Sequence, residues 1–337
     1  MTTDPPPPRR NWHFTRWLLL LAIAMLGWSG WRAYAFRSAL SQAKALGWTV
    51  RYTDPVEEIR ANWKAAFEKD TWLDGVIHVS IPTSESFVKN VAIVHRLNPR
   101  RLIIEDASTL RDLSALTPLT RLQIVSLGSS TVLTNVDALK YLSALQTVYL
   151  DGCKGLTNVD ALKSLSSLRE VSLFGCTTLT NVDALKNIFA LQSVALRECT
   201  GLANMDALKN LPALKNVVLN DCTGLTNVDG LKNLSTLQGV SLDGCAGLTN
   251  VDALKNLPAL QAVWVANCTG LTNVDALENL SVLKEVHLEG CTGLTNVDGL
   301  KNLTALKMVF LNGCTGLSKE SVAALKAALP NANIIGP

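Results

Sequence analysis

The sequence predicts an α/β fold, a right-handed solenoid with a parallel sheet on its concave face and short helical or 3-10 turns on its convex face. Three observations support this fold class. A 23-residue unit recurs eight times between Leu133 and Gly316. Apolar residues in each unit follow the spacing of Leu145, Val148 and Leu150, which predicts one short strand per unit. All eight cysteines occupy one position of the unit: Cys153, Cys176, Cys199, Cys222, Cys245, Cys268, Cys291 and Cys314.

Length and charge restrict the class of partner. A chain of 337 residues is long for one domain, but a solenoid grows by stacking because each coil contacts only its neighbours. The formal net charge is +3, and five arginines up to Arg37 outweigh the single acidic residue Asp4. The rest of the chain is close to neutral and has no basic stripe. This distribution argues against binding of nucleic acid.

The amino-terminal segment predicts a membrane anchor over residues 17–36, after a cytoplasmic proline- and arginine-rich tail over residues 1–16. The uncharged run from Trp17 to Trp31 covers roughly 22 Å of a hydrocarbon core about 30 Å thick, and apolar neighbours lengthen it. Tryptophans bracket the run like an interfacial belt. Because a short tail before a first span usually stays in the cytoplasm, we expect a single-pass protein whose repeats lie outside it, in the periplasm or at the cell surface.

Two alternatives to a retained signal-anchor stay open. Ala33, Tyr34 and Ala35 form an A-x-A site, as expected of a cleaved signal peptide. A buried core helix would also be apolar, although tryptophans and leucines beside arginines argue against it. Arginines on both sides of the run leave the positive-inside count undecided.

Residues 37–99 are predicted to link the anchor to the repeats and to cap their open end. The patterns predict five elements in order: a helix from Ser38 to Leu46, a strand from Trp48 to Tyr52, a helix after Pro55, a strand from Val76 to Ile81 and a helix from Ser84 to Arg96.

The repeats are predicted to extend over residues 100–316, in about ten coils. Leu102 stands two units before Val148, so the period reaches upstream of the eight regular units. The unit that begins at Leu110 keeps this period and has Ser130 at the cysteine position. Residues 317–337 predict a closing helix and strand, which form a C-terminal cap.

The leucine spacing and the unit LTNVDALKYLSALQTVYLDGCKG resemble the repeats of the leucine-rich-repeat superfamily, over about residues 100 to 335. The layout is similar to that of bacterial membrane-anchored leucine-rich-repeat proteins, with a short tail, one membrane segment, a region containing LGWTVRYTD and then repeats. The superfamily resemblance implies a curved parallel sheet that binds other proteins and carries no catalytic residues. Many members have asparagine where this chain has cysteine, so thiols replace the usual internal amide ladder.

Three rows of repeated residues are interpreted as scaffold. The cysteines should stack about 4.8 Å apart, and a straight row cannot place four thiolates around one zinc ion, so we predict buried, reduced and metal-free thiols. The aspartates from Asp137 to Asp298 are predicted to N-cap the convex turns rather than to bind calcium. The asparagines from Asn135 to Asn296 are predicted to satisfy backbone groups of the preceding turn.

The sequence predicts neither an enzyme nor a cofactor site. Only one histidine, His287, lies near a potential nucleophile, Cys291. The two side chains are expected to face opposite sides of the backbone, too far apart for a cysteine–histidine nucleophile. No phosphate-cradling glycine loop and no Ser-His-Asp arrangement stands out.

The candidate ligand-binding residues lie at outward strand positions that vary between units, because the positions that recur serve stacking. Trp264, His287 and Phe310 share one such position on three consecutive strands, with Glu289 and Asn312 to one side. An apolar centre with a polar rim is the composition of an interface hot spot. The predicted residues are Trp264, Glu285, His287, Met308 and Phe310, and a second group Tyr149, Phe174 and Arg197.

These patterns together predict a membrane-anchored interaction module that binds a protein or peptide on its concave face. Two other functions stay open: a structural spacer without a dedicated ligand and, third, an enzyme. A spacer would tolerate polar replacement of the concave aromatic residues, and a binding protein would not.

Overall fold

A computed structural model describes residues 31, 34–52 and 76–336. Most of the predicted anchor over residues 17–36 and the whole helix predicted after Pro55 lie outside the described residues. Within the described part, residues 34–45 are helical, in agreement with the helix predicted from Ser38. No helix among the described residues is both long enough and apolar enough to cross a membrane.

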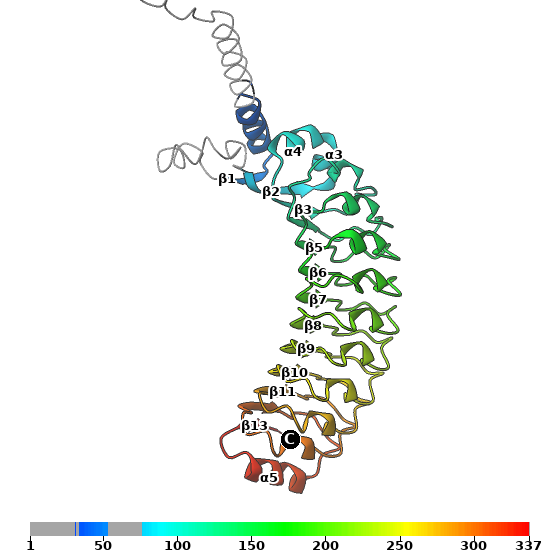
Figure 1. The fold of residues 1–337 in the computed structure, drawn as a ribbon, viewed down its shortest axis with the longest axis vertical. Helices are drawn as coiled ribbons and strands as arrows, with labels where there is room; N and C mark the ends of the chain where they lie inside the picture. Colours follow the sequence, from blue (N-terminus) through cyan, green and yellow to red (C-terminus); the bar gives the residue numbers. More distant parts are fainter. Residues whose placement is uncertain (1–30, 32–33, 53–75, 337) are drawn as a thin grey trace, which may run out of the picture.

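The described chain forms one 13-stranded sheet in which the strands follow sequence order. All neighbouring pairs from β2 to β13 are parallel, and the sheet lines the inner side of a gentle arc (Figure 1). This arrangement confirms the predicted parallel sheet. The strands inside the predicted repeats are β3 (Arg101–Asp106), β4 (Ile124–Leu127), β5 (Thr147–Tyr149), β6 (Glu170–Ser172), β7 (Ser193–Ala195), β8 (Asn216–Val218), β9 (Gly239–Ser241), β10 (Ala262–Trp264), β11 (Glu285–His287) and β12 (Met308–Phe310).

The outer side of each coil from β3 to β11 carries a single 3-10 turn, as predicted (Figure 1). A 3-10 helix is short because its hydrogen-bond geometry is poor. This short length suits the few residues that each coil has on its outer side. The turns are η2 (Ser114–Leu116), η3 (Asp137–Tyr141), η4 (Asp160–Ser164), η5 (Asp183–Leu185), η6 (Asp206–Leu208), η7 (Asp229–Leu231), η8 (Asp252–Leu254), η9 (Asp275–Leu277) and η10 (Asp298–Leu300).

The predicted role of the aspartates is wrong, because the asparagines cap these turns instead. Each aspartate is the first residue of its turn, so the N-cap position falls on the residue before it, such as Val228 before η7. Asn227 Oδ1 accepts a hydrogen bond from the Asp229 amide at 3.1 Å, and the same bond recurs in all eight units. The Asp229 carboxylate points outward to Lys232 Nζ, 2.9 Å away.

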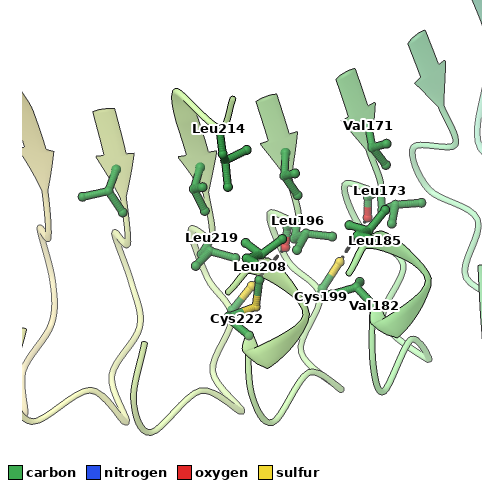
Figure 2. Packing of buried hydrophobic residues seen from close by; sticks show 14 of the residues in the cluster. Val171, Leu173, Val182, Leu185, Leu196, Cys199, Leu208, Leu214, Leu219 and Cys222 are labelled. Atoms are coloured by element: carbon green, nitrogen blue, oxygen red, sulfur yellow. Dashed lines mark hydrogen bonds between the residues drawn. The ribbon is translucent and has the colours of Figure 1, made fainter. Parts of the chain in front are cut away.

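The core is a continuous stack of leucine, valine and cysteine side chains between the sheet and the 3-10 turns. Leu150 and Leu242 are fully buried, which confirms the predicted register. Figure 2 shows Cys199 and Cys222 beneath the strands, each directed at the coil before it. Cys222 Sγ donates to the Leu196 carbonyl oxygen at 3.0 Å. Seven of the eight cysteines donate in this way, so the thiol takes over the interstrand hydrogen bond of an internal amide ladder.

The amino-terminal edge of the solenoid is covered by β1 (Thr49–Tyr52), which pairs antiparallel with β2 (Val76–Thr83). The single helix predicted from Ser84 to Arg96 is wrong, because the chain forms α3 (Ser84–Lys89) and α4 (Val91–Leu97). Asn90 separates the two helices: its backbone is not helical, and its side-chain amide donates to the Ser86 carbonyl oxygen at 3.0 Å. This competing side-chain bond ends α3.

The carboxyl-terminal edge is closed by α5 (Lys319–Ala328) and β13 (Asn333–Ile335), which confirms the predicted closing helix and strand. Ser318 caps α5, and its side chain accepts a hydrogen bond from the Ser321 amide at 3.1 Å. β13 pairs in parallel with β12 and so adds one strand beyond the last regular coil.

Candidate functional site

Trp264, His287 and Phe310 lie side by side on the concave face, and we call them the aromatic column. Trp264 pairs in register with His287, and His287 pairs with Phe310, across β10, β11 and β12. The ring centroids of Trp264 and His287 are 5.8 Å apart. Those of His287 and Phe310 are 4.3 Å apart, and these two rings are stacked. All three side chains are partly exposed, so they present an ordered aromatic strip to solvent.

The Trp264 ring lies beside a glycine of the preceding coil. A Cβ atom added to Gly239 would lie 3.5 Å from Trp264 Cζ3, so the indole leans over β9 where no side chain occupies the sheet. The aromatic column therefore begins with a tryptophan that covers Gly239. The added Cβ would make only an ordinary van der Waals contact with the ring and would lie closer, 3.2 Å, to Asn216 Oδ1.

Glutamates and one methionine border the aromatic column. Glu285 and Met308 pair in register on one side. On the other side, Glu289 Oε1 lies 3.5 Å from His287 Nδ1. Glu289 Oε2 is buried and has no hydrogen-bond partner among the described residues. A buried carboxylate oxygen without a donor is costly, so the fold holds this side of Glu289 at an energetic cost.

Asp243 completes the acidic side of the site, and the sequence patterns did not identify it. Its carboxylate accepts a hydrogen bond from the Ala266 amide of the next coil at 2.8 Å. Burial raises the pKa of Asp243 above its usual range, against the opposing effect of its hydrogen bonds, and the negative charge of Glu289 raises it further. Two carboxylates two coils apart therefore influence each other across Ala266. Only the stacking of coils reveals this, because the two residues are far apart in sequence.

The second predicted group is brought together only in part. The Arg197 guanidinium lies over the Phe174 ring, 5.9 Å from its centroid. Arg197 Nε also lies 3.6 Å from Asp221 Oδ2, an ion pair that the sequence patterns did not predict. Tyr149 lies apart from these residues, beside Glu170. Burial and this carboxylate raise the pKa of the Tyr149 hydroxyl.

The cysteine row has the chemistry of a buried scaffold. All eight thiols are free and buried. Burial raises the pKa of Cys245 to about 11 and that of Cys222 to about 12, so the thiols stay protonated at neutral pH and act as donors. Cys291 is fully buried, whereas His287 faces the concave side, which confirms that the two face opposite ways. In the described part of the chain, no group of three or more His, Cys, Asp or Glu side chains is arranged to hold a metal ion.

Several solved structures are similar to this chain. An internalin (inlF) from Listeria monocytogenes is 20% identical with a TM-score of 0.46, and the match covers 67% of this chain and 76% of that chain. Internalin C2 from the same species is 24% identical with a TM-score of 0.45, over 53% of this chain and 76% of that chain. The leucine-rich repeat domain of the type III effector XCV3220 (XopL) is 19% identical with a TM-score of 0.46, over 70% and 76%.

The repeats also match a family model. No curated protein matches the sequence. The model that describes the BspA type leucine-rich repeat region matches residues 129–249 and 208–318, in six copies. Together these matches cover more than half of the chain and contain the aromatic column. The chain therefore belongs to the BspA-type leucine-rich-repeat family.

Proposed function

We propose that this protein is an interaction module that binds a protein or peptide partner on the concave face, at the aromatic column. Leucine-rich-repeat solenoids generally mediate protein interactions. The observation that carries the proposal is the set of three partly exposed rings held in register on β10, β11 and β12. The stacking of His287 on Phe310 and the tilted contact of Trp264 with His287 order the rings before a partner arrives, so little side-chain entropy is lost on binding.

The surroundings of the column support the same proposal. Aromatic anchors surrounded by polar groups are the usual composition of an interface hot spot. Glu285, Glu289 and Met308 surround the rings, and none of the three is fully buried. By contrast, the recurring leucines and cysteines are buried, and the recurring asparagines bond to the convex turns. We infer a binding role without catalysis, since the cysteines, the strongest nucleophiles of the repeats, serve the core as protonated donors.

We also propose that residues 17–36 tether the protein to a membrane and that the repeats face away from the cytoplasm. Support comes from the uncharged run Trp17 to Trp31 with its flanking tryptophans and arginines. Protease added to intact cells should then digest the repeats. Repeats that stay protected until the membrane is broken would reject the orientation, and a mature chain that begins near Phe36 would reject the anchor.

Affinity capture with the full-length protein tests the binding proposal. We expect a partner that is retained by wild type to be lost from Trp264→Ala and Phe310→Ala. Phe189→Ala is the matched control, because Phe189 is an aromatic side chain that is 59% exposed outside the concave strands. A partner that all variants hold equally well would remove the aromatic column from consideration. The structural spacer would be favoured by two results together: the wild-type protein retains no partner, and the Trp264→Ala variant keeps the function of the protein.

A further inference from the structure

The amino-terminal half of the concave face contains one arginine, Arg197, that contacts both an aromatic ring and a carboxylate. Arg197 lies over the Phe174 ring, 5.9 Å from its centroid, and forms an ion pair with Asp221 at 3.6 Å, so one guanidinium contacts an aromatic ring and a carboxylate. Both aromatic and acidic contacts favour this group, because a guanidinium is planar, permanently charged and weakly hydrated. The repeat scaffold is thus able to present an arginine-binding arrangement on this row.

The same row continues toward the aromatic column without another arginine. In steps of 23 residues, Arg197 is followed by Asn220, Asp243, Ala266, Glu289 and Asn312. Ala266 therefore occupies in its coil the position of Arg197, with a carboxylate in the coil before it and another in the coil after it. These neighbours are two strand steps apart, about 10 Å along the sheet. We call this place the seat: Ala266 as its floor, Asp243 and Glu289 as its ends, and Trp264 beside it.

Each component of the seat is held in place by the fold. The Ala266 amide fixes the Asp243 carboxylate at 2.8 Å. Glu289 Oε1 lies 3.5 Å from His287 Nδ1, and the second carboxylate oxygen of Glu289 is buried without a hydrogen-bond partner among the described residues. Trp264 projects from the same face of the chain as Ala266, two residues away. The seat thus offers two carboxylates and an aromatic ring, and one carboxylate oxygen still lacks a donor.

The charges around the seat are negative. Among the described residues at the three outward positions of the coils of β9 to β12, the ionisable side chains are Asp243, Glu285, Glu289 and His287, without a lysine or arginine. Lys284 and Lys307 lie just before their strands, at the opposite margin. Lys284 Nζ donates there to Gln261 Oε1 at 2.9 Å. Charge complementarity therefore favours a cationic group from the partner.

We propose that the partner inserts an arginine side chain over Ala266, between Asp243 and Glu289 and against Trp264. This inference rests on the proposed function and names the chemistry of its ligand, a protein or peptide with an exposed arginine. The guanidinium supplies donors to the two carboxylates and stacks on an aromatic face. A lysine ammonium satisfies fewer of these contacts because it is a compact point charge without a flat face.

The test uses the full-length protein and a short fluorescein-labelled peptide that has one arginine between two leucines, titrated by fluorescence anisotropy. The matched probe contains citrulline, which has nearly the shape of arginine but no charge. We expect the arginine peptide to bind about tenfold or more tightly than the citrulline peptide, because charge-assisted hydrogen bonds are lost in the latter. Equal binding of the two peptides, or binding of neither, would overturn the proposal.

Two variants locate the binding. Ala266→Arg places a guanidinium of the protein itself in the seat, as Arg197 does in its own coil. The preference for the arginine peptide over the citrulline peptide should then disappear. Ala266→Ser, the control, should keep this preference. Glu289→Gln keeps the shape of the side chain and removes its charge, and should weaken the arginine peptide by about tenfold. Unchanged binding by Glu289→Gln would reject the seat even if Ala266→Arg failed to fold.

The partner protein separates this proposal from the proposed function. A partner that is lost from Trp264→Ala but held equally well by wild type and Glu289→Gln would reject the arginine seat and leave concave binding in place. A partner that is indifferent to Trp264→Ala as well would reject both.

Discussion

The interior and the concave face of each coil come from the same short strand and the residues just after it, yet they differ in how strictly they repeat. Inward residues such as Leu219 and Cys222 recur as leucine, valine or cysteine in successive coils and are fully buried. Outward residues on the same strands range from Gly239 to Trp264. The difference teaches that stacking constrains the inward positions and leaves the outward positions free of that constraint. The interior must be identical because every coil stacks on the next, while the concave face is free to vary.

The largest effect should follow from breaking the interior. Leu219→Ala removes a fully buried side chain and leaves a cavity between coils. We expect the free energy of unfolding to fall by about 3 to 5 kcal/mol, measured by urea denaturation. Partner binding at a temperature where the variant is folded should be unchanged, since Leu219 lies below the sheet. A loss under about 1 kcal/mol would show that the core does not carry the stability.

The opposite behaviour is expected on the concave face. Trp264→Ala should weaken partner binding by about 2 kcal/mol, roughly thirtyfold, because it removes the terminal ring of the aromatic column. The melting temperature should stay nearly unchanged, since the ring points away from the core. Calorimetric titration and thermal unfolding check the two parts. A large drop in melting temperature with unchanged affinity would show that Trp264 serves stability and not partner binding.

Alkaline pH should weaken the interior through its thiols. Burial raises the folded-state pKa of Cys222 to about 12, whereas an unfolded thiol has a pKa of about 8.5. A raised folded-state pKa gives stability that is complete below the unfolded pKa and is lost as pH rises toward the folded one. Each such thiol should therefore lower the free energy of unfolding by about 1.4 kcal/mol per pH unit between about pH 9 and 12.

Cys222→Ser isolates one of these thiols, because serine keeps a donor for the Leu196 carbonyl oxygen and does not titrate. Urea denaturation at pH 8 and pH 10 should show a smaller loss of stability in the variant than in wild type. The difference should be about 2 kcal/mol over that interval. Parallel pH curves for the two proteins would mean that this thiol ionises freely in the folded state.

The smallest effects belong to the convex turns. Asn227→Ala removes the side-chain acceptor of the Asp229 amide and should cost about 1 kcal/mol of unfolding free energy. Lys232→Ala, in the same turn, breaks only an exposed ion pair with Asp229 and should change stability by less than about 0.5 kcal/mol. Thermal unfolding of both variants compares them. A costlier Lys232→Ala would return the capping role to the aspartate row.

The regular part of the fold could be predicted because the sequence repeats with one period. Leu150 and Leu242 are buried where the period places them, and the aromatic column lies in register for the same reason. Asn90 interrupts the helix predicted from Ser84. The sequence pattern did not predict this break, because apolar periodicity gives no sign of a competing side-chain hydrogen bond. Asp243 and Asp221 escaped prediction because each acts on a residue of a neighbouring coil. Such contacts depend on side-chain reach, which the spacing of residues does not encode.

Photo-crosslinking tests the central claim, concave binding at the aromatic column, most directly. Full-length protein with a benzophenone amino acid in place of His287 carries the reactive group in the middle of the column, and a second version carries it in place of Phe189. We predict that the first crosslinks to the captured partner and the second does not. Crosslinking from position 189 with none from position 287 would contradict the account.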